Sequence, residues 1–164
     1  MPEYVIRPAV LGDMPRLGHI MSRSFRAGFA PFISPETLEA CAVEENCAAL
    51  LEGLFREGKM QFLTDGKYGM LVWTLHGNGE AEIMAIHTLP ESWGTGLGHA
   101  LLTRALEDIG DRPVFLWAFA ENRRARRFYE KHGLRFDGTA RTSEFDGAQE
   151  VRYILTNTKE LSHE

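Results

Sequence analysis

Residues 81–110, AEIMAIHTLPESWGTGLGHALLTRALEDIG, constrain the fold most, because an apolar strand pattern passes through a glycine-rich turn directly into a helical pattern. Three glycines alternate at Gly94, Gly96 and Gly98, and glycine lets backbone N–H groups turn toward one point without interference from side chains. The unpaired N–H groups and the positive dipole end of the following helix face the same point. This arrangement predicts a phosphate site; a tight turn that binds nothing is the alternative at this level.

The glycine loop does not match the two common nucleotide-binding patterns. The dinucleotide fingerprint G-x-G-x-x-G fails because Leu101 occupies the position of its last glycine. The P-loop pattern fails because no lysine followed by Ser or Thr comes after the loop. The loop therefore predicts a phosphate compound other than a simple nucleotide.

The composition fits one compact domain. The chain has 164 residues, 44% of them hydrophobic; we assign 1–156 to the domain and 157–164 to a polar tail. The net charge of −5 argues against a nucleic-acid-binding face. Neither a long apolar run nor a signal-like leader is present, so no membrane association is expected. Cys41 and Cys47 form neither a disulfide framework nor a metal site, so we expect no metal and a cytoplasmic setting.

Hydrophobic periodicity and cap residues predict both helices and strands. Helices are expected over 14–28 after Asp13, in one or two pieces between Ser34 and Gly58, over 98–110 and over 122–133. Strands are expected over 4–8, 60–64, 68–75, 80–89 and 113–119, followed by a closing hairpin about Asp146 and Gly147. The predicted fold class is α+β, with a mixed, mostly antiparallel central sheet flanked by helices.

Two longer segments resemble the motifs of a known family. Residues 85–102, AIHTLPESWGTGLGHALL, resemble motif A of the GNAT superfamily of N-acetyltransferases, and residues 121–136, ENRRARRFYEKHGLRF, resemble its motif B. Trp93 stands where the family usually has Arg or Gln, so the loop is expected to bind pyrophosphate through backbone N–H groups. The resemblance implies a single-domain GNAT-like fold, acetyl-CoA as co-substrate, and direct transfer of the acetyl group to an amine acceptor.

The resemblance also implies which residues contact acetyl-CoA. The pyrophosphate is expected on the backbone of Gly94, Thr95, Gly96, Leu97, Gly98 and His99. The pantetheine arm is expected to run as an extra strand beside Ile86, His87 and Thr88, one of whose N–H groups polarises the thioester carbonyl. The His87 side chain itself is predicted to be packed rather than catalytic. Asn122 is expected to hydrogen-bond the cofactor as well as to cap its own helix.

Two side chains are candidates for proton transfer. Tyr129 lies seven residues after Asn122 and therefore on the same helix face. By resemblance its hydroxyl protonates the departing CoA thiolate, whereas core packing is the alternative. Glu82 resembles the base of some histone-acetylating members of the superfamily, and two-residue alternation places it on one strand face with Met84 and Ile86. A solvated glutamate at a strand end is the alternative for Glu82.

Basic residues crowd the motif B helix, and one or two of them are expected at the 3′-phosphate of CoA unless the cluster is only a solvated face. They are Arg123, Arg124, Arg126, Arg127 and Lys131. Four aromatic residues either wall the acceptor pocket or belong to the core. They are Phe25, Phe29, Phe32 and Trp73.

The acceptor is expected to be an amine on a small molecule or a protein, with no nucleic acid and no membrane involved, in a monomer or homodimer. The segment between Gly28 and Lys59 and the hairpin after Asp137 would shape its pocket, but neither carries a specific signature. Two rival hypotheses remain. One is a catalytically inactive CoA-binding module for sensing or interaction, and the other is a nucleotide-binding protein with a glycine loop.

Overall fold

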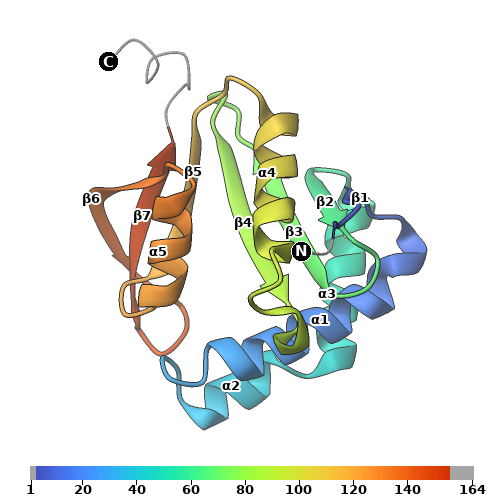
Figure 1. The fold of residues 1–164 in the computed structure, drawn as a ribbon. Helices are drawn as coiled ribbons and strands as arrows, with labels where there is room; N and C mark the ends of the chain where they lie inside the picture. Colours follow the sequence, from blue (N-terminus) through green and yellow to red (C-terminus); the bar gives the residue numbers. More distant parts are fainter. Residues whose placement is uncertain (1–2, 156–164) are drawn as a thin grey trace.

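The structure, a computed structural model, describes residues 3–155, so the tail predicted for 157–164 lies outside the described residues. These residues form a seven-stranded sheet in the order β1-β2-β3-β4-β5-β7-β6 together with five α-helices (Figure 1). The strands are β1 (Arg7–Pro8), β2 (Met60–Thr64), β3 (Gly69–Leu75), β4 (Ala81–Thr88), β5 (Val114–Phe119), β6 (Arg135–Thr142) and β7 (Gln149–Leu155). The helices are α1 (Met14–Gly28), α2 (Pro35–Cys41), α3 (Glu44–Glu57), α4 (Leu97–Ile109) and α5 (Arg123–Lys131).

The sheet is antiparallel except at its centre, where β4 and β5 run parallel. These two strands pair only at Ala81 with Val114 and at Glu82 with Phe115. Beyond those pairs they diverge, and Figure 1 shows the opening as a V with α4 over one arm and α5 over the other. In the described part of the chain, residues 83–88 of β4 therefore have no strand partner on the side that faces β5.

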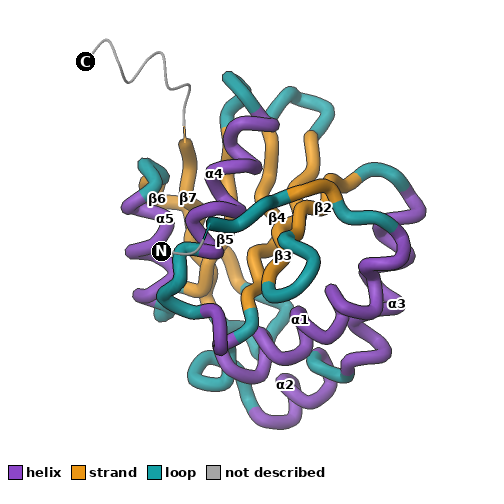
Figure 2. The backbone as a smooth tube through the Cα atoms, turned by 45° about the vertical axis from the view of Figure 1, so that its right-hand side comes forward, coloured by secondary structure: helices purple, strands orange, loops and turns teal. Residues whose placement is uncertain are grey.

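Two apolar clusters cover the two faces of the sheet. Leu71 and Ile83 pack on one face against α4 and its buried Leu101. Met70 and Val72, the alternate residues of β3, pack on the other face in a cluster with residues of α1 and α3. Figure 2 shows α1 and α3 stacked on that second side of the sheet. The predicted α+β class with a mixed, mostly antiparallel sheet is confirmed.

Three predicted helix boundaries are confirmed by cap geometry. The Ser34 hydroxyl accepts a hydrogen bond from the backbone N–H of Thr37 at the start of α2. Gly58 ends α3 in the left-handed conformation, with φ 75° and ψ 9°. Asn122 caps α5 by accepting a hydrogen bond from the backbone N–H of Ala125. The asparagine of motif B therefore marks the start of α5.

The sequence predicted that Asp13 caps α1, but its side chain makes no capping hydrogen bond. Its carboxylate instead accepts two hydrogen bonds from the Arg7 guanidinium, at 2.8 and 3.0 Å, and one from the backbone N–H of Val10. The ion pair with Arg7 holds the pKa of this carboxyl below its usual value. The predicted strand 4–8 is correspondingly short, because only Arg7 and Pro8 pair with β2.

Candidate active site

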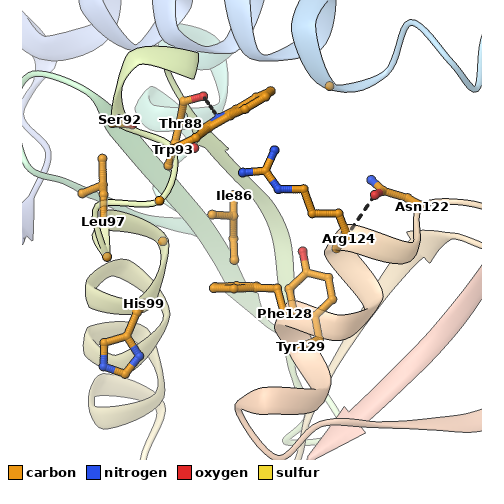
Figure 3. A pocket seen from close by; sticks show the side chains of 15 residues that line it. Ile86, Thr88, Ser92, Trp93, Leu97, His99, Asn122, Arg124, Phe128 and Tyr129 are labelled. Carbon is orange, nitrogen blue, oxygen red and sulfur yellow. Dashed lines mark hydrogen bonds between the residues drawn. The ribbon is translucent and has the colours of Figure 1, made fainter.

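A pocket with a volume of about 390 Å³ lies where β4 and β5 separate, between the N-terminus of α4 and α5 (Figure 3). Most of the side chains and backbone segments around it come from motif A and motif B. The lining residues are Gly28, Ile86, Thr88, Ser92, Trp93, Gly94, Gly96, Leu97, Gly98, His99, Asn122, Arg124, Ala125, Phe128 and Tyr129.

The glycine loop leaves the first N–H groups of α4 available to a ligand. Gly94 and Gly96 have φ of 79° and 92°, in the left-handed region that favours glycine. Gly96 is the residue before the first turn of α4, and no side chain caps this helix end. Thr95 faces away from the pocket, where its hydroxyl accepts a 2.6 Å hydrogen bond from the Tyr4 hydroxyl. The loop is therefore fixed from outside while its backbone stays open toward the pocket.

His87 lies on β4 between two residues of the pocket wall, but its side chain points to the opposite face of the sheet. The imidazole is buried beside Phe25, with ring centres 5.2 Å apart, and its Nδ1 lies 3.1 Å from the Ser24 hydroxyl. Burial lowers the pKa of His87 to about 4 because desolvation penalises the charged imidazolium. The prediction that this side chain is packed is confirmed.

The buried imidazole makes stability depend on pH. Because the pKa of His87 is about 4 when folded, against an ordinary value of 6.5 for histidine, the unfolded chain binds more protons between these values. Stability therefore falls as the pH drops through that window and is fully present above it. Between about pH 7 and pH 5 we expect a loss of about 2 kcal/mol in the free energy of unfolding, measured by urea denaturation.

His87→Phe is the control, since it keeps an aromatic ring and cannot titrate. Its stability should vary less with pH than that of the wild type by about the same 2 kcal/mol. Parallel pH profiles of the two proteins would mean that the imidazole is not desolvated.

Motif B supplies the opposite wall of the pocket. Asn122, Ala125 and Tyr129 line it from one face of α5, as their spacing predicted. Figure 3 shows the Tyr129 hydroxyl pointing into the pocket, near Ile86 and Arg124. Burial raises the pKa of Tyr129 to about 12, so its hydroxyl stays protonated near neutral pH. The arrangement therefore places a protonated phenol among the residues that line the pocket.

Glu82 is not brought into this pocket. A register shift in the β3–β4 pairing leaves Met84 as an extra residue, because Trp73 lies opposite Ile83 and Val72 opposite Ala85. Such a bulge reverses the alternation of faces, so the prediction that Glu82 and Ile86 share a face was wrong.

Glu82 lies instead on the face opposite α4. There it lines a shallow groove with Phe115 and Trp117. Its carboxylate is 2.9 Å from Nε2 of His76, whose ring stacks on Phe115.

The structure separates the basic residues of α5 into different roles. Arg126 donates hydrogen bonds to the Tyr153 hydroxyl and the Ala120 carbonyl, so it ties α5 to β7 and to the end of β5. Arg124 instead reaches across the pocket to the ring of Trp93, 4.1 Å from the guanidinium carbon (Figure 3). The sequence analysis named Arg124 only as one of five basic candidates for the 3′-phosphate of CoA. It did not place Trp93 in the pocket lining, although the departure of residue 93 from the family pattern was a signal.

The four aromatic residues that the sequence assigned either to the acceptor pocket or to the core lie in two different places. Phe25 and Phe29 form an edge-to-face pair at the end of α1, and Phe29 and Phe32 both contact Phe119 at the end of β5. Trp73 is part of the core beneath α4. The phenylalanine cluster therefore lies at the open end of the V, on the side of the sheet that carries α1.

Within residues 3–155, no group of three or more His, Cys, Asp or Glu side chains is arranged to hold a metal ion. No helix formed by these residues is both long and apolar enough to cross a membrane.

The fold is that of solved acetyltransferases. The PaiA N-acetyltransferase from Thermoplasma acidophilum, solved in complex with coenzyme A, superposes with a TM-score of 0.76 at 20% identity, over 92% of this chain and 98% of that one. A spermidine/spermine N-acetyltransferase from Vibrio cholerae gives a TM-score of 0.70 at 18% identity, over 97% and 96%.

The sequence relationship is more specific than the fold. The chain belongs to the acetyltransferase (GNAT) family, whose model matches residues 20–134. An uncharacterised N-acetyltransferase of Mycobacterium tuberculosis (strain H37Rv) is 27% identical over 150 residues, which cover 87% of this chain and 96% of that protein. A probable N-acetyltransferase of the same organism is 27% identical over 143 residues, which cover 81% of this chain and 80% of that protein.

Proposed function

We propose that this chain binds acetyl-CoA in the pocket between β4 and β5 and transfers its acetyl group directly to an amine within a ternary complex. One observation carries the proposal. The uncapped N-terminus of α4, the unpartnered edge of β4 and the Tyr129 hydroxyl meet in a single pocket. The structural neighbour from Thermoplasma acidophilum, which was solved with coenzyme A, supports this choice of cofactor.

The pocket suits the two chemically different parts of acetyl-CoA. The N–H groups of Gly94 and Gly96 and of the first turn of α4, together with the helix dipole, favour the pyrophosphate. The N–H of Thr95 is not among them, because it donates a 3.2 Å hydrogen bond to the Ser92 carbonyl. The open edge of β4 at Ile86, His87 and Thr88 can pair with the amide groups of the pantetheine arm as an added strand does. The Asn122 side-chain oxygen already caps α5, which leaves its amide nitrogen as the donor for the arm.

The residues around the thioester divide the chemistry between them. A backbone N–H on the open edge of β4 polarises the thioester carbonyl as the amine attacks it. Tyr129, whose pKa is raised to about 12, donates its hydroxyl proton to the sulfur as the carbon–sulfur bond breaks. It regains a proton from solvent afterwards. Neither cysteine lines the pocket, in keeping with direct transfer without an acyl-enzyme.

The acceptor amine must lose a proton, and we assign that task to Glu82 acting through water. With the cofactor on the α4 and α5 side, the amine approaches from the opposite face of the sheet, where Glu82 lies beside Trp117. The carboxylate is largely buried, with 15% of its side chain exposed, and is held by His76. In this proposal Glu82 acts in the proton pathway of the acceptor rather than in contact with the thioester.

Glu82→Gln is expected to lower kcat by about tenfold and to leave CoA affinity unchanged. The substitution removes the proton acceptor, whereas water substitutes for it in part, so the loss lies near or below the low end for a general base. Glu80→Gln, in the same groove, is the matched control and should retain wild-type kcat. Equal rates for the two variants would show that the amine arrives neutral or loses its proton elsewhere.

A screen of amine acceptors, read as free thiol released from acetyl-CoA, tests the proposed function. The panel should contain polyamines, amino acids, aminoglycosides, lysine-containing peptides and peptides with free N-termini. Turnover with any of them supports the proposal. Tight CoA binding without turnover would instead favour a non-catalytic CoA-binding module, and competition by ATP would favour a nucleotide site.

A further inference from the structure

Arg124 and Trp93 join the two walls of the pocket. Trp93 belongs to the loop before α4, and Arg124 lies in the first turn of α5, yet the guanidinium carbon is 4.1 Å from the centre of the indole system. The indole is itself anchored, because its Nε1 donates a 3.2 Å hydrogen bond to the Thr88 carbonyl at the end of β4. Figure 3 shows the Arg124 side chain extended from α5 toward the loop, above Ile86 and Tyr129.

No acidic side chain of the described residues forms an ion pair with Arg124. Its contact with Trp93 is with the face of a ring, and no hydrogen bond or ion pair joins it to another side chain of residues 3–155. Arg126, two residues later, is by contrast committed to Tyr153 and Ala120. The pocket lining contains no carboxylate. The guanidinium and the uncapped N-terminus of α4 therefore both contribute positive electrostatic potential to the same pocket.

Stacking on an indole suits a guanidinium that is to bind an anion. The contact uses the flat face of the group, and the five N–H donors point outward in its plane. It also restricts a long side chain before the ligand arrives, which reduces the entropy lost on binding. A carboxylate partner would hold the arginine equally well but would neutralise its charge.

We propose that Arg124 binds the pyrophosphate of the cofactor and that Trp93 is the residue that positions it. This inference rests on the proposed function and deepens it. The cation comes from α5 rather than from the glycine loop, so one ligand group is held by both walls of the pocket. The pyrophosphate is favoured over the 3′-phosphate because Arg124 lines the same pocket as Gly94, Gly96 and Gly98.

The test compares three ligands on four purified variants by isothermal titration and turnover. CoA carries all the phosphates, 3′-dephospho-CoA keeps only the pyrophosphate, and S-acetylpantetheine has none. Arg124→Gln should weaken binding of both CoA and 3′-dephospho-CoA by about tenfold, the range expected for a charged hydrogen bond. It should leave kcat/KM for S-acetylpantetheine unchanged, which a merely structural role would not do.

Trp93→Leu should lower the affinity for CoA and for 3′-dephospho-CoA by less than Arg124→Gln does. The double variant should bind these two ligands as tightly as Arg124→Gln alone, because the two residues act through one contact. Arg127→Gln is the matched control: the same charge is removed from an exposed position on α5 outside the pocket lining. It should bind all three ligands as the wild type does.

The outcomes separate this inference from the proposed function. A wild-type protein that fails to bind CoA contradicts the proposed function. A wild type that binds CoA, with Arg124→Gln indistinguishable from Arg127→Gln, overturns the inference alone. A loss for CoA with none for 3′-dephospho-CoA would also overturn it, because Arg124 would then serve the 3′-phosphate.

Discussion

Gly96→Val is expected to weaken CoA binding by about a hundredfold. Gly96 has φ 92° and ψ 4° directly before α4, a conformation that costs a side-chain-bearing residue about 1–3 kcal/mol, the most for a β-branched one. The loop relieves this strain by moving, and the N–H groups at the start of α4 then no longer converge on the pocket. The binding energy that we propose they supply to the pyrophosphate should be lost with that geometry.

Gly58→Val is the matched control for the glycine loop. Gly58 has nearly the same backbone angles, φ 75° and ψ 9°, at the C-terminus of α3, and no atom lies within 4 Å of the position its Cβ would take. Both variants should therefore lose similar stability in thermal denaturation. Only Gly96→Val should lose CoA affinity in isothermal titration.

A folded Gly96→Val protein with wild-type CoA affinity would show that the glycine loop does not contribute to CoA binding. Equal affinity losses in the two variants would mean that binding follows global stability rather than the loop. The comparison is informative because the same strain is introduced at two helix ends and only one of them lines the pocket.

The fold and the motif A and motif B lining of the pocket are predictable from the sequence, because their signals are local. Glycines before a helical pattern specify the loop, and the seven-residue separation of Asn122 and Tyr129 specifies a shared helix face. The family membership that motifs A and B indicated is confirmed. These features depend on short stretches of chain, so no knowledge of the strand partners was required.

The placement of Glu82 failed because it depends on a partner strand. Alternation along β4 holds only until Met84, the extra residue in the pairing with β3, and nothing in the sequence of β4 marks a bulge there. The contact between Arg124 and Trp93 was missed for the same reason, since it joins segments from two motifs. Asp13 occupies the predicted cap position, but Arg7 competes for its carboxylate. In all three cases a residue outside the local pattern decides the outcome.

Tyr129→Phe is expected to lower kcat by about ten- to a thousandfold with little change in CoA affinity. In the proposed mechanism the hydroxyl acts as the sulfur departs, so its loss should raise the barrier of the chemical step and hardly affect ground-state binding. The thiolate is a passable leaving group unaided, with a thiol pKa of about 8.5, so positioning and carbonyl polarisation sustain the remaining rate. The pKa of about 12 also predicts that the wild-type rate shows no loss from tyrosine ionisation up to about pH 10.

Tyr153→Phe provides the same chemical change at a neighbouring ring, 6.2 Å away, that lies outside the pocket lining. The Tyr153 hydroxyl accepts a hydrogen bond from Arg126 and donates one to Glu130, so its removal should cost about 1–2 kcal/mol of stability and leave kcat intact. Tyr129→Phe should show the reverse, a melting temperature near the wild-type value and a reduced kcat. Melting temperature, CoA affinity and turnover are measured on the same preparations, because a stable Tyr129→Phe protein that binds CoA and turns over at the wild-type rate would make Tyr129 a packing residue alone.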